Sequence, residues 1–283
     1  MMKQEEYKAF ATDIRIETLE ALKDLGFGHI GGAMSSTDLF AVLYGGVMNI
    51  DPKNPDWEER DYFVMSKGHA GPGLYTTLAM KGYFPMEELK TINTNGTRLP
   101  SHCDRNNTPG IDMSTGSLGQ GMSTAIGIAH GLKIQDKDNY TYLLIGDGEC
   151  DEGQIWEGAL YAPQQKLDHL IAFVDYNKQQ LDGYTKDIMD LGDLKQKFAD
   201  FGWYALEVDG HDTDAIAAAI ELAKTNVGKP TMIILNTVKG KDCTFAEGVL
   251  YNHHMTFTKE ECETAINLLK AQKKAGNVKC VIK

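Results

Sequence analysis

Residues 143–153 read LLIGDGECDEG, an apolar run followed by a turn that carries two glycines and four carboxylates. A β-strand that ends in a glycine-rich turn is a usual way for a backbone to approach a phosphate. The acids of this turn are Asp147, Glu149, Asp151 and Glu152, and they would repel a phosphate. The stretch therefore predicts either an ordinary turn or a phosphate site in which a cation separates the acids from the phosphate.

A second apolar stretch, residues 168–177, ends in Asn177. Asp147 and Asn177 are 30 residues apart, the length of a strand–helix–strand crossover, so both side chains can meet at the carboxyl edge of a parallel sheet. A carboxylate, an amide oxygen and a nearby backbone carbonyl are hard ligands that suit Mg²⁺ or Ca²⁺. A divalent cation held there would bridge the acids to a diphosphate.

A dinucleotide-binding fold is the alternative, because Asp175 stands where a ribose-binding acid would lie. The fingerprint G-x-G-x-x-G is missing, since Asp151 occupies the third glycine position after Gly146 and Gly148. Without a metal, the diphosphate would also face Asp147 and its acidic neighbours. The sequence therefore favours the metal.

Apolar stretches rich in β-forming residues alternate with helical patterns along the chain. The expected strands lie within residues 61–69, 139–148, 168–177, 202–210 and 230–240. The expected helices lie within residues 7–26, 35–48, 118–134, 155–166, 194–201 and 214–225. Ser36 or Thr37 is the expected N-cap of the second helix. This order predicts an α/β fold with a mostly parallel sheet and helices on both faces. We expect one domain over residues 1–283, with 255–283 as a terminal helix and basic tail.

Composition restricts the class of protein. The net charge of −12, from 28 basic against 40 acidic residues, disfavours binding to nucleic acid or to an anionic membrane. The sequence begins without a signal-peptide core, and no apolar run approaches the roughly 18 residues that span a bilayer. The five cysteines are scattered without a C-x-x-C pair, which indicates neither a zinc site nor a disulfide framework. We expect a cytoplasmic protein in which Cys150 has a packing role.

GDG followed about 30 residues later by Asn is the thiamine diphosphate motif, and its surroundings resemble the N-terminal, diphosphate-binding half of transketolases. The segments that carry this resemblance are GHIGGAMSSTDL (28–39), DYFVMSKGHAGPGLY (61–75), STGSLGQGMSTAIGIAHG (114–131), residues 146–177, VDGHD (208–212) and NTVKGKDCTF (236–245). Several ordered motifs at compatible spacing are more specific than the metal motif alone. The likeness covers about residues 10–255 and implies the thiamine diphosphate-binding fold.

The resemblance also implies roles for individual residues. Metal ligation falls to the side chains of Asp147 and Asn177 and to the carbonyl of Gln179. The implied cofactor-binding residues are Gly116, Ser117 and Leu118 at the aminopyrimidine, Gly146 and Gly148 at the diphosphate, Leu181 packed on the cofactor, and Lys67 and Lys239 nearby. As loop residues, these two lysines could equally be exposed and solvated.

Four histidines are implied to line the channel to the reactive carbon, where they would bind sugar hydroxyls and move protons. They are His29, His69, His102 and His253, although each alone could be an ordinary core or surface histidine. The family usually has W-H-G at the last position. Here Asn252 replaces the Trp, His254 is the alternative to His253, and a substrate pocket unlike the common one is expected. Glu152 is implied to join a proton network across the subunit interface, or else it is a first-turn helix acid.

The resemblance implies an active site completed by a second chain. In transketolases, the glutamate that acts on the cofactor's pyrimidine ring belongs to a following domain. We therefore expect the N-terminal subunit of a split enzyme, in a heterotetramer with a C-terminal subunit that carries the pyrimidine-binding and third domains. Its reaction would be the thiamine diphosphate- and Mg²⁺-dependent transfer of a two-carbon ketol unit from a ketose phosphate or similar sugar to an aldose. The alternatives are a 2-oxo acid dehydrogenase α-type subunit, a deoxyxylulose phosphate synthase-like enzyme, or a non-catalytic thiamine diphosphate-binding partner.

Overall fold

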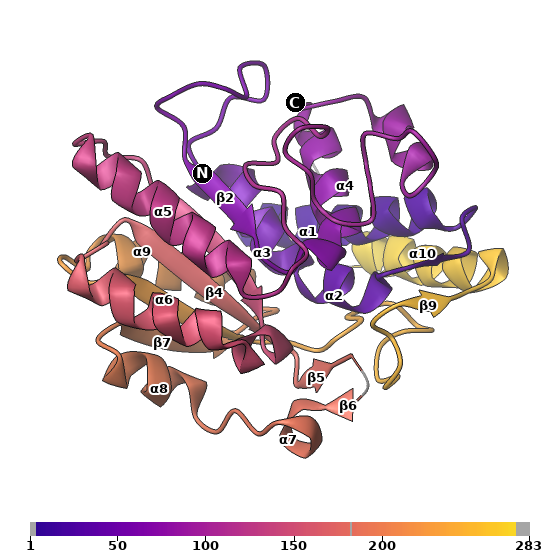
Figure 1. Cartoon of the computed structure of the whole chain (residues 1–283). Coiled ribbons are helices and arrows are strands. Elements are labelled where there is room, and N and C mark those ends of the chain that lie inside the picture. The colour runs from indigo at the N-terminus through magenta and orange to yellow at the C-terminus, as the bar shows by residue number, and fades with distance from the viewer. Residues whose placement is uncertain (1–3, 182, 276–283) are drawn as a thin grey trace.

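The computed structural model describes residues 4–181 and 183–275. Its centre is a five-stranded parallel sheet with the strand order β2-β3-β4-β8-β7 (Figure 1). The strands are β2 (Tyr62–Met65), β3 (Thr141–Gly146), β4 (Leu170–Tyr176), β7 (Tyr204–Asp209) and β8 (Thr231–Asn236). Each lies within a stretch expected from the sequence, and the predicted α/β fold is confirmed.

Side chains of the central strands alternate between two apolar cores. In β3, Tyr142 and Leu144 belong to one core, whereas Leu143 and Ile145 belong to the other. Successive side chains of a strand point to opposite faces, so a strand covered on both sides must be apolar throughout. This is the reason that β3 and β4 read as continuous apolar runs.

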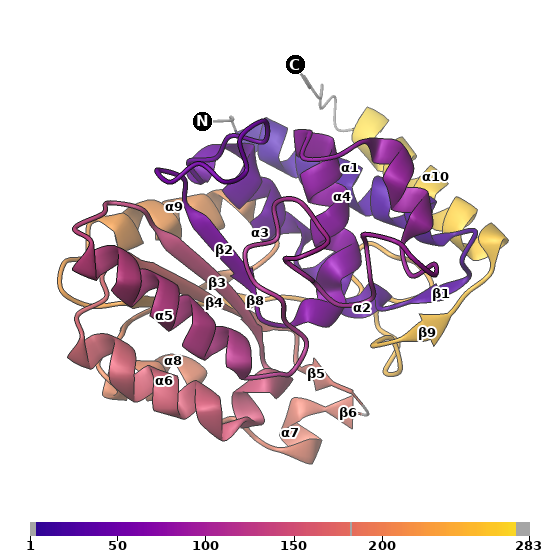
Figure 2. The ribbon, with the colours of Figure 1, turned by 45° about the horizontal axis from the view of Figure 1, so that its top comes forward.

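Helices cover both faces of the sheet (Figures 1 and 2). On one side lie α5 (Gln120–Ile134), α6 (Gly153–Gln164) and α8 (Leu194–Asp200). On the other lie α1 (Gln4–Leu22), α3 (Thr37–Val42), α4 (Gly71–Lys81), α9 (Thr213–Lys224) and α10 (Lys259–Ala275). Helix α10 is the expected terminal helix, and residues 276–283 of the expected tail lie outside the described residues. In the described part of the chain, no helix is long and apolar enough to cross a membrane.

The helix expected over residues 35–48 is interrupted. Helix α3 gives way to a π-type turn, η1 (Leu43–Val47), in which Gly46 has a φ of 152°. Ser36 stands at the N-terminal boundary of α3, as predicted, but its hydroxyl donates to the carbonyl of Gly32 (2.8 Å) and caps nothing. The predicted position of the N-cap is therefore confirmed, but its side chain makes no capping hydrogen bond, because the preceding helix α2 (Ile30–Ser35) supplies an acceptor one turn away.

Several elements had no sequence signal. Helix α4 begins with Gly71, Pro72 and Gly73, which obscure its period, and ends at Gly82 in the left-handed conformation (φ 90°). Others are too short to show any period: α7 (Thr185–Ile188), the 3₁₀ turns η2 (Gly68–Ala70), η3 (Met86–Thr91) and η4 (Gly148–Asp151), and two small antiparallel sheets. One sheet pairs β1 (Phe27–Gly28) with β9 (Met255–Thr256), and the other pairs β5 (Gln179–Gln180) with β6 (Gly183–Tyr184). The second sheet begins directly after β4 and so borders the carboxyl edge of the main sheet (Figure 2).

Candidate active site

A cavity of about 280 Å³ lies at the carboxyl edge of β3 and β4. The predicted site residues that line it are Lys67, His69, His102, Gly116, Leu118, Gly146, Asp147, Gly148, Asn177, Gln179, Leu181, Lys239 and His253. The predicted residues that do not line it are His29, Ser117 and Glu152. The fold thus brings most of the predicted site residues to one place, from loops that follow different strands.

Asp147 is buried in the turn after β3, with 2% of its surface exposed. Its Oδ1 accepts from the N–H of Gly148 (2.8 Å), and its Oδ2 accepts from the N–H of Lys178 (2.5 Å) after β4. Burial, together with the charge of Asp175, raises the pKa of Asp147 to about 7. A carboxyl group in such a place favours a cation as its partner.

The segment after β4 presents two further oxygens to the cavity. Asn177 Nδ2 donates to Asp175 Oδ2 (2.9 Å), which turns the amide oxygen the other way, where it accepts from the N–H of Gln179 (3.1 Å). The carbonyl of Gln179 accepts from Lys239 Nζ (3.4 Å). Within the described ranges, no group of three or more His, Cys, Asp or Glu residues is placed to bind a metal. A metal at this place would therefore be bound by one carboxylate, from Asp147, together with the amide oxygen of Asn177 and the carbonyl oxygen of Gln179.

Both predicted lysines are buried, so the interpretation of solvated loop lysines is wrong. Lys67 Nζ lies 2.5 Å from Asp175 Oδ2 and donates to the carbonyl of Gly32 (3.1 Å). Asp175 also accepts from the Thr237 hydroxyl (2.5 Å), which leaves it no part in binding a ribose. Lys239 is 3% exposed, and burial lowers its pKa to about 8. Asp175 is therefore not available as the ribose-binding acid that the dinucleotide alternative requires.

Glu149 is a residue of the site that sequence reasoning missed. Its carboxylate is buried and accepts from the N–H of Gly119 (2.8 Å), the N–H of Gly146 (3.0 Å) and the hydroxyl of Ser66. Burial raises its pKa despite these hydrogen bonds. Glu149 thus ties three loops of the cavity together. The only signal was its place in the acidic turn, which does not distinguish it from its exposed neighbour Asp151.

Four histidine rings surround His29. The centroid of His29 lies 5.5 Å from those of His69 and His102, 5.4 Å from His253 and 4.7 Å from His254. Burial, followed by the charges of neighbouring groups, lowers the pKa of His29 to about 4 and that of His253 to about 3. The pKa values of His69 and His102 are lowered by burial too. His29, His69 and His253 are half-buried and His102 is exposed. With their lowered pKa values, these imidazoles are neutral at pH 7 and can both donate and accept hydrogen bonds.

The structure distinguishes the two adjacent histidines. His253 lines the cavity, with Nδ1 3.5 Å from Lys239 Nζ, whereas His254 is exposed and lies against His29 and Phe27. Asn252 is fully buried, and its amide donates to the carbonyls of Ala246 (2.8 Å) and Lys239 (3.2 Å). Asn252 does not line the cavity. Any effect of Asn252 on the substrate would act through the backbone that carries Lys239 and His253, and a substrate pocket unlike the common one stays a prediction.

Two glycines allow loops to meet closely at the cavity. Gly116 has a φ of 138°, and a Cβ there would lie 2.8 Å from His102 Cδ2. A Cβ on Gly148 would lie 2.5 Å from the Cβ of Gln180. Any side chain at either position would displace the wall of the cavity.

Four predicted site residues are exposed, and one of them is His102, which lines the cavity. Ser117 does not line the cavity, and its hydroxyl accepts from Gln120 Nε2 (3.3 Å). Glu152 stands at the N-cap of α6 without a capping hydrogen bond from its side chain. Leu181 lines the cavity but leaves 58% of its surface exposed.

Cys150, in contrast, is buried with Sγ against the Gly146 carbonyl (3.4 Å), as expected of a packing residue.

The sequence from residue 6 to residue 275 matches the family model described as "Transketolase, thiamine diphosphate binding domain". The chain belongs to the transketolase family. This membership favours the transketolase expectation over the other thiamine diphosphate enzymes considered from the sequence.

Relatives of similar length are named as parts of divided transketolases. The chain is 54% identical over 256 residues to the 6-deoxy-6-sulfo-D-fructose transketolase subunit SqwG of Clostridium sp. (strain MSTE9), and the match covers 90% of this chain and 93% of that protein. It is 40% identical over 265 residues to an apulose-4-phosphate transketolase subunit of Actinobacillus succinogenes, and this match covers 94% and 95%. Both of these relatives are thus named as subunits of transketolases, which are transferases, and both match this chain over nearly their whole length.

Solved transketolases share the fold. The enzyme of Pichia stipitis in complex with sedoheptulose 7-phosphate superposes with a TM-score of 0.84 at 31% identity, over 96% of this chain and 45% of that one. The enzyme of Campylobacter jejuni gives 0.84 at 27% identity, over 98% and 48%. The chain thus spans about half the length of the solved transketolases that it matches.

Proposed function

We propose that this chain is the N-terminal, thiamine diphosphate- and Mg²⁺-binding subunit of a split transketolase. It transfers a two-carbon ketol unit from a ketose to an aldose, together with a separate C-terminal subunit. The observation that carries this proposal is the single cavity that joins the acidic turn, Asn177 and Gln179 to three histidines, His69, His102 and His253. In this proposal the whole chain, residues 1–283, acts as one diphosphate-binding domain in the cytoplasm. The four cysteines that the structure describes are all free, which agrees with a reducing compartment.

The donor set of the cavity fits a hard divalent cation. Asp147 would supply a carboxylate oxygen, Asn177 its amide oxygen and Gln179 its backbone carbonyl. The Lys239 ammonium already stands at that carbonyl, so this edge of the cavity accepts positive charge. Within the described chain, the side-chain carbonyls of Gln179 and Gln180 are also buried without a hydrogen-bond partner. Oxygens of this kind suit a bound cation or its water.

The remaining residues suit a diphosphate and a sugar. Gly146 and Gly148 expose backbone at the turn, and Lys67 and Lys239 supply positive charge inside the cavity. When bound, thiamine diphosphate supplies the carbon that breaks and forms the C–C bond. The neutral imidazoles of His29, His69, His102 and His253 would bind the hydroxyls of the sugar and move protons to and from them.

We propose that the donor is a ketose with an anionic group at the end away from its carbonyl. One relative is named for a sulfonated ketose and another for a sugar phosphate, so the anion itself differs within the family. The higher identity to the first makes a sulfonated ketose the donor to test beside the phosphorylated ones. A pentose phosphate is a second donor to test.

The C-terminal subunit is proposed to complete the cavity in a heterotetramer. Leu181 lines the cavity and is largely exposed, and Glu152 is exposed beside the loop of Gly119. An apolar side chain at the mouth and an exposed acid next to it suit a surface that a second chain covers. Glu152 would there contact the partner's part of the active site.

The test is ketol transfer with thiamine diphosphate and Mg²⁺, first with this chain alone and then with the C-terminal transketolase subunit encoded beside it. Xylulose 5-phosphate and 6-deoxy-6-sulfofructose serve as donors, and an aldose phosphate serves as acceptor. Turnover only in the mixture supports the proposal, and the better donor identifies the anion. Turnover by the chain alone would overturn the two-subunit site. A mixture that binds thiamine diphosphate but uses neither donor would overturn the substrate class.

A further inference from the structure

Lys239 is carried by residues 237–242, here called the lysine loop, which follows β8. Its backbone is held at the lysine itself, where the carbonyl of Lys239 accepts from Asn252 Nδ2 (3.2 Å), and on either side of it. The N–H of Val238 donates to His211 Nε2 (2.8 Å), and the N–H of Gly240 donates to the carbonyl of Gly31 (3.0 Å). The side chain between them reaches the cavity, where Nζ meets the Gln179 carbonyl. The position of Lys239 therefore depends on these backbone contacts, and the contact at Val238 is made by the side chain of His211.

His211 belongs to the loop between β7 and α9 and bridges two distant parts of the chain. Its Nδ1 lies 2.8 Å from Asp38 Oδ2, and its Nε2 faces the N–H of Val238. An amide N–H can only donate, so Nε2 must carry the lone pair. The ring proton is then on Nδ1 and is donated to Asp38. The two hydrogen bonds fix both the tautomer and the orientation of the ring.

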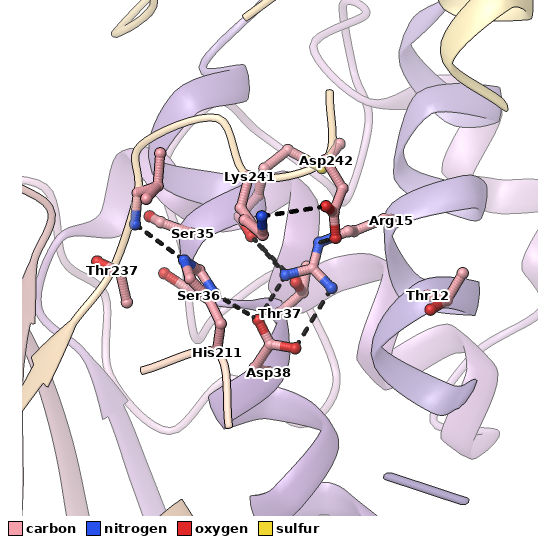
Figure 3. A network of polar contacts seen from close by, with 12 residues as sticks. Thr12, Arg15, Ser35, Ser36, Thr37, Asp38, His211, Thr237, Lys241 and Asp242 are labelled. Carbon is pink, nitrogen blue, oxygen red and sulfur yellow. Dashed lines mark hydrogen bonds and ion pairs between the residues drawn. The ribbon is translucent and has the colours of Figure 1, made fainter. Parts of the chain in front are cut away.

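Asp38 is itself fixed by a buried ion pair between helices α1 and α3. Arg15 Nη2 lies 2.5 Å from Asp38 Oδ2 and Nη1 lies 3.3 Å from Oδ1, with both side chains at most 5% exposed. Burial alone would raise the pKa of Asp38, but Arg15 and His211 hold it below its ordinary value. Arg15 Nε also faces Asp242 of the lysine loop at 3.6 Å. Figure 3 shows Arg15, Asp38 and His211 in one chain of contacts that leads from α1 to this loop.

We propose that His211 is a positioning residue that holds Lys239 in the cavity by linking the amide of Val238 to the Arg15–Asp38 pair. His211 does not line the cavity and acts through the lysine loop. The expected effect of His211 on cofactor binding rests on the proposed function, in which the Lys239 ammonium faces the diphosphate. The expected effect of His211 on the lysine loop is independent of the proposed function.

Two variants separate the hydrogen bond of His211 to Asp38 from its hydrogen bond to Val238. In His211→Asn, the amide nitrogen replaces Nδ1 and can still donate to Asp38, but nothing replaces Nε2. In His211→Gln, the amide oxygen lies three bonds from Cβ, as Nε2 does, and can still accept from Val238. If residue 211 mattered only because it donates a hydrogen bond to the buried Asp38, Asn would be tolerated better than Gln. The proposed role, which requires an acceptor for the N–H of Val238, predicts that Gln is tolerated better than Asn. His130, which lies on α5 and contacts Tyr161, supplies the matched controls His130→Asn and His130→Gln.

The first readout is hydrogen–deuterium exchange of the full chain, followed in the peptide that covers residues 237–242. We expect exchange about tenfold faster in His211→Asn, the effect of losing one hydrogen bond, and exchange near that of the wild type in His211→Gln. Equal exchange in the two variants, or faster exchange in His211→Gln, would overturn the proposal.

The second readout is the affinity of the assembled two-subunit complex for thiamine diphosphate with Mg²⁺, measured by equilibrium titration. We expect about tenfold weaker binding in His211→Asn and near-normal binding in His211→Gln and in both controls. Faster exchange without weaker binding would overturn the link from the loop to the cofactor. A wild-type complex that binds no thiamine diphosphate would instead refute the proposed function, and the exchange data would still decide whether His211 holds the loop.

Discussion

Asp147 and Asp151 lie four residues apart in the same turn, but their carboxylates face different surroundings. Asp147 is buried in the cavity and holds the N–H of Lys178, whereas Asp151 is exposed and accepts from Gln180 Nε2 (3.0 Å). The four acids of the turn thus divide into a proposed cation ligand, a structural clamp at Glu149, and two surface acids. Only the first is expected to control binding of the cofactor.

Replacing Asp147 with Ala should therefore abolish the Mg²⁺-dependent part of thiamine diphosphate binding. The loss should reach at least the roughly 10–100-fold that removal of even an outer partner of a metal site causes. The measurement is titration of the assembled complex with the cofactor, with and without Mg²⁺. Asp151→Ala is the control and should bind normally. Unchanged affinity in Asp147→Ala would refute the metal assignment.

His69 is half-buried among other imidazoles, and its lowered pKa keeps it neutral at pH 7. His69→Ala should leave thiamine diphosphate affinity nearly unchanged and slow turnover of the donor by about 100-fold, because a group that moves protons is lost. Steady-state kinetics and a binding titration on the same preparation separate these effects. If the variant loses cofactor but keeps its turnover per bound cofactor, then His69 holds the cofactor and does not act on the sugar.

At the scale of elements, helix α5 meets strand β2 through a glycine. A Cβ on Gly121 would lie 2.2 Å from Ser66 Oγ and 2.7 Å from Ser66 Cα, whereas a Cβ on Gly127 of the same helix meets nothing within 4 Å. Ser66 in turn binds Glu149. The close approach of α5 therefore supports the clamp that joins the loops of the cavity.

The two glycines should respond in opposite directions to alanine. Gly121→Ala should lower the free energy of unfolding by about 1–3 kcal/mol, because the added methyl must displace Ser66. Gly127→Ala should raise it by about 0.5–1 kcal/mol, because alanine restricts the unfolded chain and suits a helix. Denaturant unfolding of the three proteins measures both changes. Equal effects of the two substitutions would contradict the close contact of α5 with β2.

At the scale of the whole molecule, the half-buried His253 links stability to pH. The pKa of His253 is about 3 in the folded chain and about 6.5 for an unperturbed histidine, so the unfolded chain binds more protons between these values. This contribution to stability is fully present above about pH 6.5 and is lost as the pH falls toward 3. Because other groups titrate in the same pH range, the contribution of His253 is measured by comparing the wild type with a variant that lacks this histidine.

His253→Gln removes this contribution. Between about pH 7.5 and about pH 5, its free energy of unfolding should fall by about 1–2 kcal/mol less than that of the wild type. Thermal unfolding of both proteins at the two pH values measures the difference. His130→Gln, which changes a histidine outside the cavity, should follow the wild type. A variant whose loss equals that of the wild type would show that His253 is not buried neutral.

The sequence alone predicted the architecture and most of the cavity. Covalent order and the period of apolar residues are local properties, and they are sufficient to identify β3 and β4 as strands buried on both faces. The spacing of Asp147 and Asn177 placed both at one sheet edge, and the structure agrees, since Lys178 binds Asp147. Helix α4 was not predicted because glycines at its start hide its period, and the β1–β9 pair was not predicted because its strands are too short to show one.

The tertiary structure alone decided the environment of each polar side chain. Lys67 and Lys239 are buried, Asn252 lies behind the cavity, and Glu149 joins loops that are far apart in sequence. The bridge from His211 to Asp38 spans 173 residues, and no local pattern can encode it. Burial and hydrogen-bond partners depend on which distant segments pack together, whereas strand and helix depend mainly on neighbours along the chain. For this reason the sequence determined which residues could form a thiamine diphosphate site, and only the fold decided which of them face the cavity and which hold it in place.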